Sequence, residues 1–173
     1  RQTGFAMLCE GNVQEVMDLS PVAHLAALSG KVPFINFFDG FRTSHEIQKI
    51  AVWDYKDLAD MCDMDAVKAF REHALNPEHP AMRGSHENGD TFFQHREACN
   101  QYYDALPEVV EKYMGKINEK LGTDYKLFNY YGAPDADRVI IAMGSICDVA
   151  EEVIDYLNAH GEKVGLIKVR LYR

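Results

Sequence analysis

The fold is decided by the stretch Pro33-Phe34-Ile35-Asn36-Phe37-Phe38-Asp39-Gly40-Phe41-Arg42-Thr43-Ser44-His45-Glu46, in which an apolar run gives way abruptly to a polar loop. Phenylalanine and isoleucine dominate residues 34–38, and such an almost unbroken apolar run is typical of a strand covered on both faces of a parallel sheet. Asp39-Gly40 is a turn-forming pair, so we expect the strand to end there.

The loop after this strand carries five polar or ionic side chains: Asp39, Arg42, Thr43, Ser44 and His45. Ligands of open α/β sheets bind at the carboxyl ends of strands, which makes these residues candidates for a binding site. The residue types alone favour a structural role. In that interpretation Asp39 and Thr43 bond to backbone groups of the turn, and Arg42 forms a surface ion pair with Glu46. Both interpretations are open at this point.

The residues before this strand predict the first half of a βαβ unit. Residues 1–9 contain a short apolar segment that we expect to be an interior strand. Asn12 and Glu15 form a capping box, and apolar residues then recur at helical spacing up to Gly30, which we expect to follow the helix end. Pro21 lies inside this pattern. It either kinks the helix or marks a later start for it.

The middle of the chain shows weaker patterns. We expect an extended piece at 47–52, a core role for Trp53, and two short helices capped by Asp54 and Asp63. Residues 76–91 show no periodicity, and loops of this length are usually functional or wrapped on a neighbour. Several side chains there have metal-binding groups but lack the spacing of a known site, so we expect no metal at Glu78, His79, His86, Glu87 and Asp90.

The last third contains a second α/β unit. Pro107 is expected to start an amphipathic helix that Gly122 ends. Residues 125–134 resemble an aromatic linker, and we place a domain boundary there. A strand at 139–143, a helix capped by Ser145, and a returning strand at 164–169 predict a parallel crossover. Two strands cannot bury both faces of a sheet alone, so we expect the chain to be part of something larger.

Composition excludes several classes of function. The 18 Lys and Arg residues are outnumbered by 27 Asp and Glu, giving a net charge of -9, and the basic residues are scattered. We therefore expect no nucleic-acid partner and no attraction to an anionic membrane. No apolar stretch approaches the ~20 residues of a membrane span, and the N-terminus lacks the pattern of a secretory signal, so we expect a cytoplasmic protein. The four cysteines form no CxxC pair, and we expect reduced thiols without a zinc or iron–sulfur site.

The residues by themselves name no reaction, but five blocks of the sequence resemble one family closely. These blocks are 1–8, 37–50, 76–80, 132–136 and 168–173, which read RQTGFAML, FFDGFRTSHEIQKI, NPEHP, GAPDA and KVRLYR. They resemble pyruvate:ferredoxin (flavodoxin) oxidoreductases, and the resemblance extends over essentially the whole chain. Residues 9–12, residues 86–89 and Gln101 depart from the pattern of the family, which puts any role of those loop positions in doubt.

The resemblance implies a fold and a function. It implies an α/β fold in which residues 1–124 form the latter part of a parallel, pyrimidine-type thiamine-diphosphate-binding domain. Residues 125–173 would then be the first βαβ unit of a domain similar to the C-terminal domain of transketolases. Family members are dimers that oxidise pyruvate to acetyl-CoA and CO2 and reduce ferredoxin or flavodoxin. They use thiamine pyrophosphate with Mg2+ and [4Fe-4S] clusters.

The resemblance also implies that the groups that carry out catalysis lie outside these 173 residues. We therefore expect the isolated chain to bind no cofactor and to be inactive, while it packs against the remaining domains of the same polypeptide. Asp39, Arg42, Thr43, Ser44 and His45 are the positions that could line the thiamine cleft or a domain interface. The alternative is a non-enzymatic α/β scaffold or docking module that keeps only the framework.

Overall fold

The first third of the chain forms a parallel βαβ unit, as the sequence predicts. The computed structural model describes residues 2–82, 84 and 86–173. Arg1, in the first family-like block, and Arg83 and Ser85, in the aperiodic loop, thus lie outside the described residues. Strand β1 (Ala6–Cys9) leads into helix α1 (Val13–Gly30) and then strand β2 (Phe34–Phe37), which pairs with β1 in parallel.

Helix α1 begins at the predicted N-cap Asn12, but the return bond from Glu15 goes to the amide of Gly11, one residue before the N-cap. The Asn12 side chain accepts the Glu15 amide at 3.0 Å, and Glu15 in turn accepts the Gly11 amide at 2.8 Å. The helix runs through Pro21, so the proline marks no later start. A proline cannot donate to the carbonyl four residues earlier. That carbonyl belongs to Met17, and the Trp53 indole donates to it at 3.2 Å, which explains why the single tryptophan packs against this helix.

The prediction that Gly30 follows the end of α1 is wrong. Gly30 is the last helical residue, and Lys31 takes the left-handed conformation with φ 56°. A Cβ on Gly30 would lie 2.9 Å from Leu106 Cδ1. The glycine is therefore needed for close packing of α1 against helix α5, and a residue with a side chain takes over the helix end.

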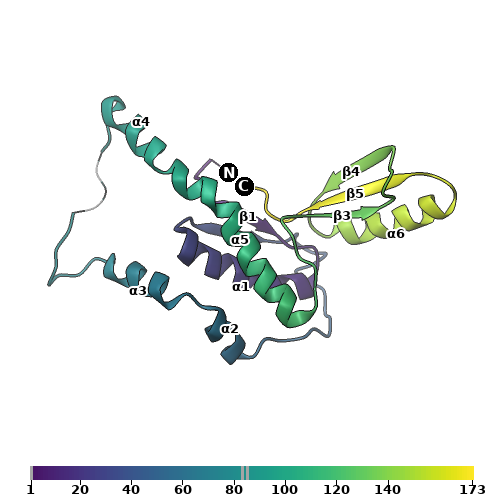
Figure 1. Cartoon of the computed structure of the whole chain (residues 1–173), viewed down its shortest axis with the longest axis horizontal. Coiled ribbons are helices and arrows are strands. Elements are labelled where there is room, and N and C mark those ends of the chain that lie inside the picture. The colour runs from purple at the N-terminus through teal and green to yellow at the C-terminus, as the bar shows by residue number, and fades with distance from the viewer. Residues whose placement is uncertain (1, 83, 85) are drawn as a thin grey trace.

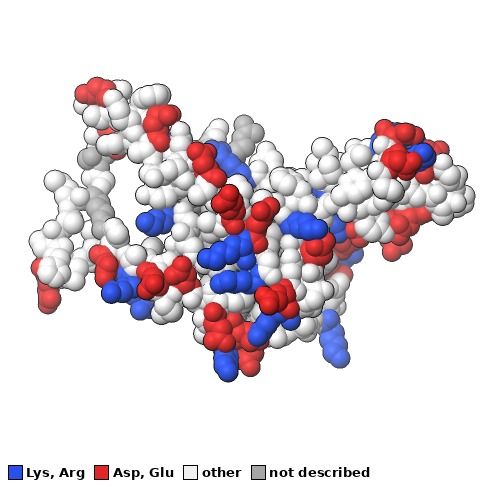
Figure 2. All heavy atoms as spheres, in the orientation of Figure 1, with Lys and Arg blue, Asp and Glu red and all other residues white. Residues whose placement is uncertain are grey.

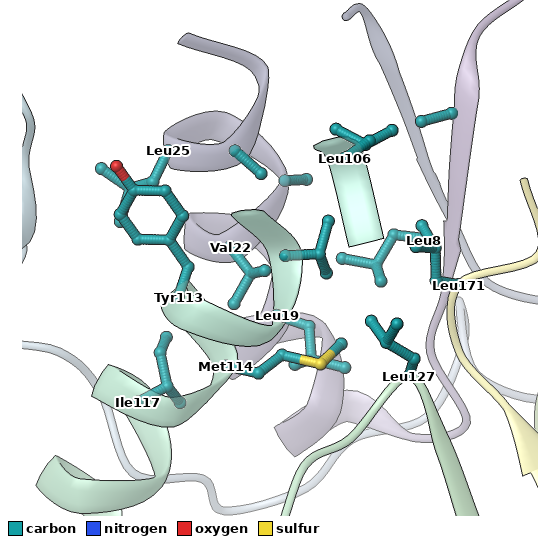
Figure 3. Packing of buried hydrophobic residues seen from close by; sticks show 14 of the residues in the cluster. Leu8, Leu19, Val22, Leu25, Leu106, Tyr113, Met114, Ile117, Leu127 and Leu171 are labelled. Carbon is teal, nitrogen blue, oxygen red and sulfur yellow. The ribbon is translucent and has the colours of Figure 1, made fainter. Parts of the chain in front are cut away.

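Helix α5 (Asn100–Leu121) packs on α1 and completes the main core (Figure 1). It begins seven residues before Pro107, so the prediction that this proline starts the helix is wrong, whereas Gly122 ends it as predicted. Figure 3 shows the packing, in which Tyr113, Met114 and Ile117 of α5 face α1. The β1–β2 sheet contributes less to the core than expected. Ile35 is 37 % exposed, so the prediction that β2 is covered on both faces does not hold among the described residues.

The segment between β2 and α5 lies largely on the surface. No strand forms at 47–52. Helices α2 (Tyr55–Met61) and α3 (Met64–Glu72) are capped by Asp54 and Asp63 as predicted, and α4 (Gly89–Ala98) precedes α5. None of the residues of α3 is buried, and Figure 1 shows α3 and α4 extending away from the core. No described helix combines the length and apolarity that crossing a membrane requires.

The second α/β unit contains three strands instead of the two expected. Strand β3 (Phe128–Gly132) lies within the predicted linker and pairs antiparallel with β5 (Val164–Val169), while β4 (Arg138–Ala142) pairs with β5 in parallel. The order is β3-β5-β4, with α6 (Ile146–Ala159) forming the crossover from β4 to β5. The predicted parallel crossover is therefore confirmed. The linker prediction missed β3, because its aromatic residues pair with a strand that comes later in the chain.

The end of the chain joins the two units. The Cys9 amide donates to the Arg170 carbonyl at 2.8 Å, and the Tyr172 amide donates to the Met7 carbonyl at 2.9 Å. Residues 170–173 thus cover the edge of β1 that β2 leaves free, with an antiparallel bridge between Leu8 and Leu171.

Candidate functional site

The candidate loop lies at the carboxyl end of β2, where the sequence places it. Within the turn, the Arg42 amide donates to the Gly40 carbonyl at 2.8 Å, and Phe41 takes a left-handed φ of 60°. This geometry buries Thr43, which is 4 % exposed, and leaves Arg42, Ser44 and His45 exposed. The five candidate side chains therefore do not converge on one point.

Asp39 and Thr43 are the two candidates that the structure brings together. The Thr43 hydroxyl lies 3.2 Å from Asp39 Oδ1 and 3.4 Å from the Gly11 carbonyl, and it has a single hydrogen to donate to one of them. Asp39 Oδ1 also accepts the Ser145 amide at 3.1 Å. The carboxylate from the first unit therefore caps helix α6 of the second.

Ser145 does not cap α6, contrary to the sequence prediction. Its own dihedral angles are helical, with φ -65° and ψ -18°, and its side chain makes no capping bond. The Asp39 carboxylate takes that place and also complements the positive end of the helix dipole. Burial alone would raise the pKa of Asp39, but hydrogen bonds from Ser145 and Thr43 outweigh it and lower the pKa below its usual value.

The other three candidates make local surface contacts. Arg42 pairs with Glu46 at 3.1 Å, one helical turn apart in sequence. Ser44 Oγ accepts the Phe41 amide at 2.9 Å and lies 2.8 Å from His45 Nδ1. The Phe41 and His45 rings stack with centroids 5.1 Å apart. These are the contacts of a turn that holds its own shape.

A buried ion pair between Glu15 and Arg170 also joins the two units, and sequence reasoning missed it. We call this ion pair and the Asp39–Ser145 bond together the junction. Arg170 Nη2 donates to Glu15 Oε1 at 2.7 Å, and Arg170 Nη1 donates to Asn129 Oδ1. The guanidinium also lies over the Tyr125 ring, 5.2 Å from its centroid. Glu15 and Arg170 are 155 positions apart. No local spacing could signal the pair, because only the fold brings these residues together.

Glu10 is the unusual group near this junction. It is fully buried at the end of β1, and neither carboxylate oxygen has a hydrogen-bond partner among the described residues. Burial, reinforced by the nearby Glu15 carboxylate, raises the pKa of Glu10 to about 9. Glu10 is therefore protonated at neutral pH, and its side chain is shielded from solvent.

The junction itself has little room. A cavity of about 10 Å³ lies among residues of both units, including Cys9, Gly11, Gly144 and Cys147. That volume holds one water molecule at most. Within the described ranges no three His, Cys, Asp or Glu side chains are arranged to hold a metal ion, and all four cysteines are free thiols. The Asp39–Ser145 and Glu15–Arg170 contacts at the junction join the two units.

Comparison with known proteins identifies the family. Residues 1–115 match the family model described as "Pyruvate flavodoxin/ferredoxin oxidoreductase, thiamine diP-bdg". The chain belongs to the pyruvate flavodoxin/ferredoxin oxidoreductase family. Residues 136–173 match a second model of the same family, "Pyruvate:ferredoxin oxidoreductase core domain II". The resemblance that the sequence blocks indicate is confirmed.

Individual relatives of the family match over the full length of this chain. The chain is 64 % identical over 173 residues to the pyruvate-flavodoxin oxidoreductase of Enterobacter agglomerans and 62 % identical to that of Klebsiella pneumoniae. It is 60 % identical to the pyruvate:ferredoxin oxidoreductase of Moorella thermoacetica. All 173 residues align in each case, and they span about 15 % of the length of each relative.

The described residues do not by themselves form a site for the cofactor in the family description. Thiamine diphosphate needs a cleft far larger than 10 Å³, and among the described residues of the junction no three His, Cys, Asp or Glu side chains are arranged to hold its metal ion. The larger cavities, of about 740 and 760 Å³, are lined mostly by apolar residues of α1, α3 and the segment around Trp53. Neither presents a cluster of acidic side chains.

Proposed function

We propose that this chain is part of an enzyme that oxidises pyruvate to acetyl-CoA and CO2 and passes the electrons to ferredoxin or flavodoxin. The observation that carries the proposal is the 64 % identity to a pyruvate-flavodoxin oxidoreductase across all 173 residues. The two family models match in chain order, over 1–115 and 136–173, which supports a domain boundary near 124 and 125.

In this proposal the described residues have a structural role and take no direct part in the reaction. Residues 1–124 are the latter part of the pyrimidine-binding domain, and residues 125–173 begin the next domain. Asp39 holds α6 across that boundary, and Thr43, which bonds to Asp39, also reaches the turn between β1 and α1. Arg42, Ser44 and His45 face outward, where a neighbouring domain of the longer polypeptide can contact them.

The longer polypeptide supplies the remaining parts of the proposed enzyme. It holds thiamine pyrophosphate with Mg2+, the [4Fe-4S] clusters and the sites for pyruvate and coenzyme A, and it forms a cytoplasmic homodimer. Because the junction has room for one water at most, we expect the isolated 173-residue chain to bind no thiamine pyrophosphate and to have no activity.

The test compares the full-length polypeptide with the 173-residue chain. With pyruvate, coenzyme A and an oxidised flavodoxin or ferredoxin, the full-length protein should reduce the acceptor only when pyruvate is present. The short chain should not reduce it, and calorimetry should show no heat on addition of thiamine pyrophosphate. A full-length protein without pyruvate-dependent reduction would refute the proposed activity, and clear thiamine binding by the short chain would refute the framework role.

A further inference from the structure

A cavity apart from the junction lies between helices α1 and α3 and the beginning of α5. Its volume is about 760 Å³, and small-molecule sites in proteins occupy roughly 300–1,000 Å³. The apolar part of its wall includes Leu28, Val32, Phe70 and Tyr102. The cavity therefore has the size and the apolar lining of a site for an organic molecule.

The polar side chains that line this cavity are few, and none of those described is acidic. They are His24, Lys31, His73 and the hydroxyl-bearing Tyr102. Lys31 directly follows the last residue of α1, and its Nζ lies 5.8 Å from the centroid of the Tyr102 ring. Because that ring is part of the wall, the ammonium group of Lys31 places a positive charge beside the cavity.

Lys31 has no carboxylate partner in the described part of the chain. Other lysines do, since an Asp or Glu pairs with each of Lys68, Lys120, Lys126, Lys163 and Lys168. In Figure 2 the surface between α3 and the beginning of α5 shows mostly uncharged residues. The carbonyl groups at the end of α1 carry a partial negative charge. The Lys31 ammonium group, and not the backbone, must therefore attract any anion that enters the cavity.

We propose that this cavity binds a carboxylate attached to an apolar body, either an aromatic ring system or a medium-length alkyl chain, with the carboxylate at Lys31 Nζ. Phe70 is 68 % exposed, so its ring is open to contact with such a body. Burial of apolar surface supplies most of the affinity, and the lysine selects an anion over a neutral molecule. Pyruvate, whose apolar part is a methyl group, is too small for this cavity. The site is thus separate from the proposed function and does not depend on it.

Calorimetry on the full-length polypeptide, with 2-naphthoate and octanoate as probes, tests the proposal. At least one of the two should bind, and the stronger binder identifies the body as aromatic or aliphatic. The corresponding neutral amide should bind at least about tenfold more weakly than that carboxylate, because it lacks the charge. Equal binding of carboxylate and amide would overturn the recognition of an anion. Binding of neither probe would mean that the longer polypeptide fills the cavity itself, and it would overturn the proposal.

Three variants of the full-length polypeptide locate the site. Lys31→Met keeps the apolar stem and removes the charge, so it should weaken carboxylate binding at least about tenfold and leave amide binding unchanged. Phe70→Ala removes part of the apolar wall and should weaken both ligands alike. Lys126→Met removes a lysine that pairs with Asp124, away from the cavity, and should change neither affinity.

Full affinity of Lys31→Met for the carboxylate would place the ligand elsewhere and overturn the proposal. Pyruvate-dependent reduction of flavodoxin or ferredoxin, measured on the same preparations, separates the two proposals. Lys31-dependent binding in a protein without that reduction would support the carboxylate site while refuting the proposed function. Reduction in a protein that binds neither probe would do the opposite.

Discussion

Asp39 Oδ1 accepts the Ser145 amide at 3.1 Å, which ties the loop after β2 to the first turn of α6. The two residues are 106 positions apart and belong to different α/β units. The same carboxylate is held by Thr43, whose hydroxyl also reaches the Gly11 carbonyl. A loop that has the composition of a ligand-binding loop thus serves as the cap of a distant helix.

Replacing Asp39 should loosen α6. Asp39→Ala removes the cap, so we expect a loss of about 1 kcal/mol in the free energy of unfolding and faster amide exchange at Ser145. Asp39→Asn keeps a capping oxygen and should cost less. Arg42→Ala, which removes an exposed ion pair of the same loop, is the matched control; it should cost no more than about 0.5 kcal/mol and leave exchange at Ser145 unchanged. Equal stability of Asp39→Ala and wild type would contradict the capping role.

The contribution of Asp39 should also depend on pH. Its pKa in the folded chain is lowered below the unfolded value of 3.8. The stabilisation is therefore complete above that value and is lost as the pH falls through the folded pKa. Denaturant unfolding of wild type and Asp39→Asn at pH 6 and in acid should show the two proteins converging at low pH. A constant difference would contradict the assignment.

Glu10→Gln should stabilise the chain at neutral pH. The pKa of Glu10 is about 9 in the fold and 4.5 when exposed, so wild-type stability falls as the pH rises from 4.5 toward 9. Glutamine cannot ionise and escapes this loss. At pH 7 we expect a gain on the order of 3 kcal/mol, because pH 7 lies about 2.5 units above the unfolded pKa and each unit corresponds to about 1.4 kcal/mol. Urea unfolding at pH 5, 7 and 8 should show the gain growing with pH, and a gain independent of pH would refute a protonated Glu10.

Breaking the buried ion pair should be costly. Arg170→Leu leaves the largely buried Glu15 carboxylate without its cationic partner, and we expect a loss of about 3 kcal/mol in the free energy of unfolding. Arg42→Leu removes a pair whose arginine side chain is 60 % exposed and should cost no more than about 0.5 kcal/mol. Chemical denaturation of the two variants measures the contrast. Similar losses would mean that burial of the Arg170 pair contributes little.

Thiol labelling should distinguish the buried cysteines from the half-buried ones by their rates of reaction. Burial is the main cause that raises the pKa of Cys9, to about 12, and also that of Cys147. Cys62 and Cys99 are only half-buried. Because the thiolate is the reactive form, a maleimide or disulfide reagent should label Cys62 and Cys99 first, as resolved by mass spectrometry. Early labelling of Cys9 would show that the two units separate in solution.

The sequence by itself determined the features whose causes are local. The Asn12, Asp54 and Asp63 caps and the Gly122 helix end each depend on residues within one turn of the helix they delimit, and all are confirmed. The βαβ patterns are set by side-chain periodicity, which is local as well. The family was also identifiable, because long blocks of residues carry it.

Only the tertiary structure decided the features whose partners are far apart in the chain. Gly30 has no room for a side chain because Leu106 packs against it, and α6 is capped by Asp39 and not by Ser145. Strand β3 needs β5 as its partner, and Arg170 needs Glu15. The physical reason is the same in each case: a hydrogen bond, ion pair or packing contact between distant residues leaves no periodic pattern in the sequence, and it exists only once the fold has brought both partners together.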